Sequence, residues 1–222
     1  MRLVVIGSSP AWPNAGSAHS GYVVESGGKR LLLDCGPGVL GRLREREAWP
    51  TIHSIAITHF HLDHWGDLVP WVWGSFYRRG HDDERPELWV YRGGRKYLEE
   101  LGSRLGFPDM FERTFTISEY DGDTPFTTVG LEVLPVRLPH YRLETYGFRV
   151  TNGEATLETG ESDGEPRGHL SAEEALEAYA ASGARNLLLT HRPSELPAPD
   201  GVALAYDGME VEVVPQSVRA GD

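Results

Sequence analysis

The sequence predicts an α/β (α+β) fold in a single domain over residues 1–222. Short β-rich segments fill the first part of the chain, and helical and strand patterns then intermix. Histidines follow three of the apolar strand candidates, and the ends of strands are where loops converge above a sheet. A chain of 222 residues is long enough for one sizeable core. These patterns together indicate one folded unit with a polar site at a sheet edge.

The expected elements follow in chain order. Strands over residues 2–6, 21–25 and 30–34, punctuated by glycine and proline, form an antiparallel opening meander. A helix over 39–47, a buried strand over 54–58 and an aromatic-rich helix over 68–78 come next. Ser171 and Glu174 form a capping-box pattern at the start of a later helix. The remaining elements are strands over 87–91, 114–117, 131–138, 146–150 and 186–190, helices over 95–105 and 172–181, and a closing hairpin over 202–214.

The composition of the chain limits the classes of partner that it is expected to bind. A formal net charge of -12 leaves no broad basic field, so an extended nucleic acid is not expected as a substrate. Cys35 is the single cysteine, which excludes an internal disulfide, and the N-terminus has no signal-peptide pattern. No apolar stretch approaches the ~20 residues that cross a bilayer. The sequence therefore predicts a cytoplasmic protein with no membrane partner.

Residues 58–67, THFHLDHWGD, concentrate three histidines and two aspartates after an apolar strand candidate. Imidazole and carboxylate groups together suit zinc and similar metals. His59 and His61 alternate in an extended segment, so both rings can lie on one side. Asp63 and His64 come after the chain turns and can face a second position. The alternative is a histidine-rich surface turn, and the density of ligand types favours two adjacent metal positions.

Four side chains cannot fill two coordination spheres, so further ligands must come from elsewhere in the chain. His140 follows the strand expected over 131–138, and His191 ends the apolar run at 186–190. Each histidine taken alone is more typical of a surface or capping position. Their shared placement at strand ends, like that of His59, favours metal binding for both.

Several motifs resemble the metallo-β-lactamase-fold hydrolases, and within them the ribonuclease Z-like branch. They are GSSP at 7–10, LLLDCG at 31–36, the HxHxDH at 59–64, His140, GHLSAEEA at 168–175 and LLLTH at 187–191. The resemblance implies an αββα four-layer sandwich with the site at one edge, here shortened in the second half. It also implies a zinc cofactor, one or two ions, with manganese or iron as alternatives. By resemblance His59, His61 and His140 bind one metal, Asp63, His64 and His191 bind the other, and Asp34 orients the histidine turn.

The chain departs from these relatives between His140 and His169. Relatives place there a Ser-Gly-Asp turn whose aspartate bridges both metals, and later a Glu-Ala-Thr segment; this interval is too short for both. One alignment sets EAT at 154–156 on the Glu-Ala-Thr segment; the other sets TGE at 159–161 on the Ser-Gly-Asp turn. The first is preferred because EATLE leads into GHLSAEEA in the right order. A bridging aspartate is not identified, Glu161 and Asp163 remain candidates for that role, and the second metal is expected to bind more weakly.

The resemblance makes His169 the proton donor to the leaving oxygen, paired with Glu154. The alternative is that His169 only precedes the cap of the following helix. The expected function is a metal-dependent hydrolase that attacks with a metal-activated water oriented by Asp63, most consistent with a phosphodiesterase. The alternatives are a thioesterase or lactonase of the same fold, or a non-catalytic metal-binding relative. The expected substrate is a small molecule or nucleotide-like compound, and the oligomeric state is open, with a homodimer among the alternatives.

Overall fold

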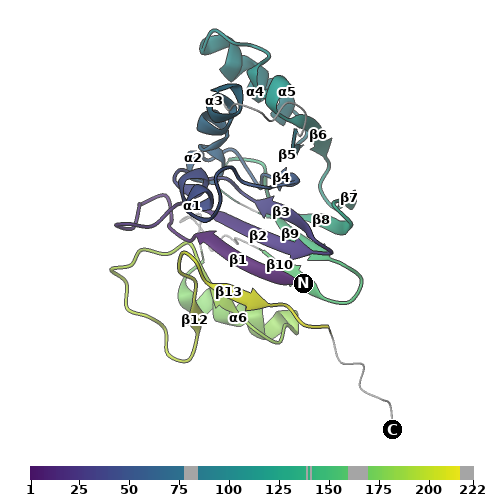
Figure 1. The fold of residues 1–222 in the computed structure, drawn as a ribbon. Helices are drawn as coiled ribbons and strands as arrows, with labels where there is room; N and C mark the ends of the chain where they lie inside the picture. The colour runs from purple at the N-terminus through teal and green to yellow at the C-terminus, as the bar shows by residue number, and fades with distance from the viewer. Residues whose placement is uncertain (78–84, 139, 141, 160–169, 216–222) are drawn as a thin grey trace.

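Two facing β-sheets form the centre of the structure, a computed structural model that describes residues 1–77, 85–138, 140, 142–159 and 170–215 (Figure 1). The larger sheet has the order β13-β1-β2-β3-β4-β5-β6, and the smaller has the order β10-β9-β8-β7. The larger contains β1 (Arg2–Gly7), β2 (Gly21–Ser26), β3 (Lys29–Leu33), β4 (Ser54–Ala56), β5 (Glu87–Tyr91), β6 (Thr116–Tyr120) and β13 (Glu210–Glu212). The smaller contains β7 (Phe126–Thr128), β8 (Leu131–Leu138), β9 (Thr145–Thr151) and β10 (Thr156–Glu158), and a separate pair joins β11 (Leu188–Leu189) to β12 (Ala203–Leu204).

The strand alternation of the sequence divides the core into two layers. Leu31 and Leu33 of β3 belong to the cluster between the sheets, whereas Leu32 belongs to the cluster on the other face of the larger sheet. Successive residues of a strand point to opposite faces, so this apolar run supplies both layers at once. Phe148 and Val150 of β9 close the inter-sheet layer from the smaller sheet.

Helices cover the outer face of the larger sheet. The outer core cluster includes buried residues from α1 (Val39–Arg46), α3 (Leu68–Tyr77), α4 (Gly94–Arg104) and α5 (Met110–Thr114). The one-turn helix α2 (Leu62–Trp65) lies between β4 and α3 in the chain. The last helix, α6 (Ala172–Ser182), has no buried residue and lies on the side of the C-terminal strands, away from α3–α5 (Figure 1). The described residues therefore form a helical layer and two packed sheets, with α6 beside the C-terminal strands (Figure 1).

Most sequence expectations for these elements are confirmed, two are wrong, and two short strands were missed. The opening meander forms by antiparallel pairing of β1, β2 and β3, and the Ser171 capping box is present. The closing hairpin over 202–214 does not form, because β12 pairs with β11 and β13 pairs with β1. The strand expected over 114–117 begins only at Thr116, because residues 110–114 form α5. The short strands β7 and β10 were not expected, since three residues are too few to show a period.

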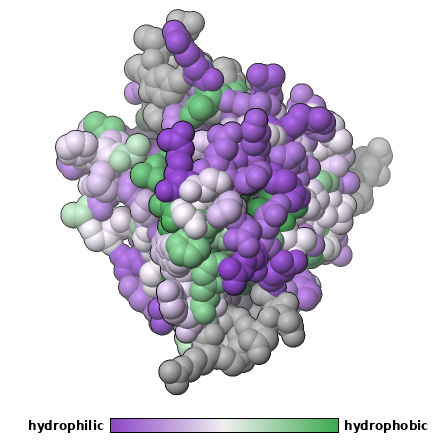
Figure 2. All heavy atoms as spheres, turned by 90° about the horizontal axis from the view of Figure 1, so that it is seen from above, coloured by the Kyte–Doolittle hydropathy of each residue, from purple (hydrophilic) through white to green (hydrophobic). Residues whose placement is uncertain are grey.

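The face above α3–α5 is mainly hydrophilic, with hydrophobic side chains gathered near its centre (Figure 2). Tyr77, Tyr97 and Phe107 are the exposed aromatic residues that α3, α4 and the loop after α4 contribute. Within the described part of the chain, no helix combines the length and the apolar character that crossing a bilayer requires.

Candidate metal centre

The centre is built where two parallel strands of the larger sheet end. Because β3 and β4 run parallel, their carboxyl ends meet at one edge, with Asp34 after β3 and Thr58 after β4. The histidine turn is pinned to the loop after β3: Cys35 N donates to His64 O at 2.6 Å. Gly36 permits this close approach, because a Cβ at that position would lie 2.0 Å from the carbonyl oxygen of Asp63. A side chain at Gly36 would therefore push the metal-binding turn away from the sheet.

Three histidines converge at the first position. The Nδ1 of His61 lies 3.1 Å from Nε2 of His59 and 2.9 Å from Nε2 of His140. His59 and His140 are buried, and His61 is half-buried. His59 and His61 come from the turn after β4, and His140 comes from the loop after β8, so the two sheets meet at this point.

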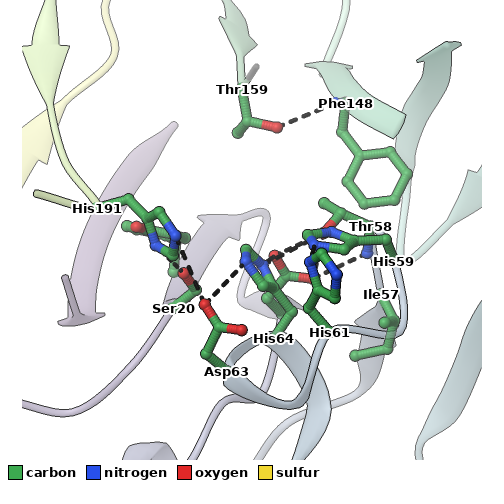
Figure 3. Close-up of polar contacts among 12 residues, drawn as sticks. Ser20, Ile57, Thr58, His59, His61, Asp63, His64, Phe148, Thr159 and His191 are labelled. Carbon is green, nitrogen blue, oxygen red and sulfur yellow. Dashed lines mark hydrogen bonds and ion pairs between the residues drawn. The ribbon is translucent and has the colours of Figure 1, made fainter. Parts of the chain in front are cut away.

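Asp63, His64 and His191 converge at a second, adjacent position. The Oδ2 of Asp63 lies 3.4 Å from Nε2 of His64 and 3.5 Å from Nε2 of His191. Figure 3 shows Asp63 and His64 between His191 on one side and His59 and His61 on the other. The rings of His59 and His64 are only 4.0 Å apart between centroids, so the two positions share one wall.

His191 is held from the loop that follows β1. Its backbone N–H donates to Ser8 O at 3.0 Å, and its Nδ1 lies 3.0 Å from the hydroxyl of Ser20. The residue has a φ of 57°, in the left-handed region that non-glycine residues rarely adopt. Such backbone conformations persist where surrounding contacts enforce them, and here those contacts direct Nε2 toward Asp63.

Burial and neighbouring charges set the protonation states of His59 and Asp63. Burial lowers the pKa of His59, and the adjacent His64, His140 and His61 lower it further. Burial alone would raise the pKa of Asp63, but its hydrogen bond with His64 and the charges of His64 and His191 bring it well below its usual value. At neutral pH the site therefore offers a neutral imidazole and an ionised carboxylate, which are the forms that bind metal.

The donor set fits a divalent metal ion. Two nitrogens bound about 2.0–2.1 Å from one tetrahedral zinc lie about 3.3 Å apart, close to the separations within the three-histidine group. In each of the two groups the ligand atoms lie within 4.8 Å of one another. Neutral imidazoles with one carboxylate suit zinc and iron better than calcium or magnesium.

The six residues that the sequence assigned to metal binding therefore lie together in two groups. They are His59, His61, Asp63, His64, His140 and His191. Asp34 contacts the histidine turn as the resemblance implied, with Oδ2 accepting from Nδ1 of His64 at 2.7 Å. Thr58 and Ser20 were missed, although both contact ligand imidazoles. The Thr-His dipeptide at 58–59 was an available signal for Thr58; Ser20 had none.

Glu154 lies far from these groups. It is exposed in the turn between β9 and β10, where Asn152 donates to Ser26 Oγ at 3.4 Å. Ser26 ends β2, whereas Ser20, before the start of β2, lies at the site. A seven-residue strand spans roughly 20 Å, which is too far for a side chain to reach. This placement argues against the expectation that Glu154 is catalytic.

The pairing of β10 with β9 argues against the preferred alignment, which sets residues 154–156 on the Glu-Ala-Thr segment of the relatives. Strand β10 runs back along β9, and Thr159 N donates to Phe148 O at 2.8 Å. Figure 3 shows Thr159 and Phe148 across from the site histidines. Strand β10 therefore runs back toward the site, and Thr159 faces it where the described residues stop, in keeping with the alternative alignment of TGE on the Ser-Gly-Asp turn. Glu161, Asp163 and His169 lie outside the described residues.

Comparison with known proteins agrees with this architecture. The family model described as anti-Pycsar protein Apyc1 matches residues 1–167. The probable metallo-hydrolase YhfI of Bacillus subtilis (strain 168) is 28% identical over 225 residues, 87% of each chain. Ribonuclease Z of Streptomyces coelicolor is 27% identical over 187 residues, which cover 82% of this chain and 55% of that protein.

Solved structures show the same fold. The crystal structure of B. subtilis YhfI superposes with a TM-score of 0.78 at 21% identity, covering 95% of this chain and 99% of that one. The short form of human tRNase Z gives 0.75 at 20% identity, covering 96% and 99%. The first of these is a metallo-β-lactamase fold protein, so the predicted fold is confirmed.

Proposed function

This chain belongs to the family described as anti-Pycsar protein Apyc1, and from that premise and the site geometry we propose that it is a phosphodiesterase. It is a metal-dependent hydrolase of the metallo-β-lactamase fold, similar to ribonuclease Z. The observation that carries the proposal is the pair of adjacent ligand groups that share a wall between His59 and His64. Paired metal positions recur in enzymes that displace groups at phosphorus.

Different residues of the site are proposed to bind the metal, to orient the attacking water and to protonate the leaving group. A divalent metal ion held there would lower the pKa of water toward neutrality and stabilise negative charge on a phosphoryl oxygen. Asp63 stays ionised next to His64 and His191, so it can accept a hydrogen bond from an attacking water. His169, which lies outside the described residues, is proposed as the acid for the leaving oxygen. We propose zinc as the metal, because five of the six ligands are imidazoles.

The charge of the chain supports a small substrate. At -12 the formal net charge repels an extended phosphate backbone, whose binding normally depends on many lysine and arginine contacts. A compact nucleotide-like phosphodiester requires only local compensation, which metal ions at the site would supply. The ribonuclease Z relative supports phosphodiester chemistry by its name, and it is longer than this chain.

Turnover of three ester classes tests the proposal. Zinc-loaded protein is assayed with bis(p-nitrophenyl) phosphate, with a thioester and with a lactone. The expected result is hydrolysis of the phosphodiester, lost in His61→Ala because a methyl group cannot replace a ligand imidazole. Selective turnover of the thioester or lactone would instead assign the chain to that class. Stoichiometric metal with no turnover of any substrate would identify a non-catalytic relative.

A further inference from the structure

A single buried carboxylate contacts the second ligand group directly and is linked to the first through one hydroxyl. Asp34 lies between the ends of β3 and β4 with only 4% of its surface exposed. Its Oδ2 accepts from Nδ1 of His64 at 2.7 Å, a direct contact with the second group. Its Oδ1 accepts the backbone N–H of Thr58 at 2.8 Å. The carboxylate has no direct hydrogen bond to the first group in the described residues.

The hydroxyl of Thr58 makes the missing connection. Thr58 Oγ1 lies 3.0 Å from Oδ1 and 2.9 Å from Oδ2 of Asp34. The same oxygen lies 3.0 Å from Nδ1 of His59 and, more distantly, 3.4 Å from Nδ1 of His64. A carboxylate offers only acceptors, so the single hydroxyl proton must point toward Asp34. The hydroxyl oxygen then has only lone pairs to present to His59.

This arrangement determines the tautomer of His59. A lone pair on Thr58 Oγ1 requires a proton on Nδ1 of His59, which leaves the lone pair of Nε2 directed at His61. The opposite tautomer would direct an N–H at the metal position and leave two lone pairs facing each other across 3.0 Å. The hydrogen-bond chain from Asp34 through Thr58 therefore prepares His59 as a ligand.

We propose that Thr58 is a positioning residue that links Asp34 to His59, so that one carboxylate orients ligands of both metal positions. Asp34 acts on His64 directly and on His59 only through the Thr58 hydroxyl. His64 keeps its closer contact with Asp34, at 2.7 Å, when that hydroxyl is removed, so the loss should fall mainly on the three-histidine position. Changing Asp34 should weaken both positions. The inference rests on metal binding by these residues, and it holds whichever ester is hydrolysed.

The experiment measures zinc affinity by competition with a chelator in two backgrounds. His191→Ala isolates the three-histidine position, and His61→Ala isolates the position of Asp63 and His64. Thr58→Val keeps the side-chain shape and removes the hydroxyl, and Thr58→Ser keeps the hydroxyl. Thr190→Val is the matched control, because Thr190 also precedes a ligand histidine but its hydroxyl contacts Tyr22 at 2.7 Å.

For Thr58→Val, the loss of zinc affinity is expected in the His191→Ala background. Thr58→Val should weaken zinc binding about 10–100-fold in the His191→Ala background, as loss of a hydrogen bond behind a ligand typically does. It should leave the His61→Ala background close to its parent. Thr58→Ser and Thr190→Val should stay close to the parent in both. Asp34→Asn, which tolerates the φ of 58°, should weaken both.

Three results would overturn the inference. Unchanged zinc affinity in Thr58→Val would remove the hydroxyl from any role at the metal position. An equal loss in Thr58→Ser would assign the effect to packing. Long-range ¹H–¹⁵N spectra of the metal-free wild type, which need no variant to fold, should show the proton of His59 on Nδ1; a proton on Nε2 would contradict the proposed chain.

Discussion

At the scale of single residues, the centre depends on buried imidazoles. His59 and His140 are 1% and 2% exposed, and burial lowers the pKa of His59, which favours its neutral form. Each imidazole has only two nitrogens, so a hydrogen bond at one directs the other toward metal. For His59 and His191 the orienting groups are the hydroxyls of Thr58 and Ser20. Small hydroxyl residues next to ligands are thus as much a part of the site as the ligands.

The two residues proposed for the leaving-group proton should behave differently. Glu154→Gln should leave kcat/KM close to that of the wild type, because Glu154 is exposed at the far end of β9. His169→Ala should slow hydrolysis of an alkyl phosphodiester by about 10²–10⁴-fold and an activated aryl ester far less, since only the poor leaving group needs an acid.

Parallel assays of both substrates with both variants give the comparison. Equal losses on the two esters in His169→Ala would favour a capping role for that histidine. A large loss in Glu154→Gln would show that the strand placement of this turn is wrong.

At the scale of elements, the C-terminal segment stabilises the loop between β1 and β2 that positions His191. Strand β13 pairs with β1, and the preceding turn inserts Asp207 into the loop between β1 and β2. Asp207 accepts hydrogen bonds from the hydroxyl of Ser17 at 2.7 Å and from Ala18 N at 2.8 Å. It also accepts from Ser8, whose carbonyl receives the N–H of His191. The tail therefore braces the loop that positions a metal ligand.

Asp207→Ala should lower the free energy of unfolding by about 2–3 kcal/mol, because several donors to a largely buried carboxylate would lose their acceptor. Urea unfolding of the metal-free protein measures the change without a contribution from metal. The matched control is Asp200→Ala at an exposed position, expected within about 0.5 kcal/mol of the wild type. Equal stability of the two variants would show that Asp207 does not brace this loop.

At the scale of the whole molecule, the metal centre joins segments that are distant in sequence. The turn after β4, the loop after β8 and the loop after β11 each supply ligands. The strands that precede these segments belong to three different sheets. A bound metal would therefore cross-link these segments, and its removal should lower the free energy of unfolding.

Zinc titration should show one tight and one weaker equivalent, because two nearby cations repel and no bridging carboxylate lies within the described residues. The tight equivalent belongs to the three histidines. Chelation should lower Tm by about 5–10 °C if zinc was present at about 100-fold its Kd. An unchanged Tm would contradict the cross-link.

Two equally tight equivalents would mean that a carboxylate supplies the bridge. Glu161→Ala and Asp163→Ala, each titrated with zinc, would then identify it by loss of the second equivalent. Thr159 faces the site histidines (Figure 3), and Glu161 follows it two residues later in the sequence, so Glu161 is the first residue to test.

The sequence by itself determined the local features. The alternation of β3, the capping box at Ser171 and the spacing of HxHxDH depend on neighbours within a few residues, where period and geometry are set by the chain itself. Only the tertiary structure decided the partners of β11, β12 and β13, and the direction in which β10 returns the chain. It also decided the meeting of Asp34, Thr58 and His59. Pairing between distant segments depends on which apolar faces can be buried together, and that choice is made by the whole core rather than by any short stretch of the chain.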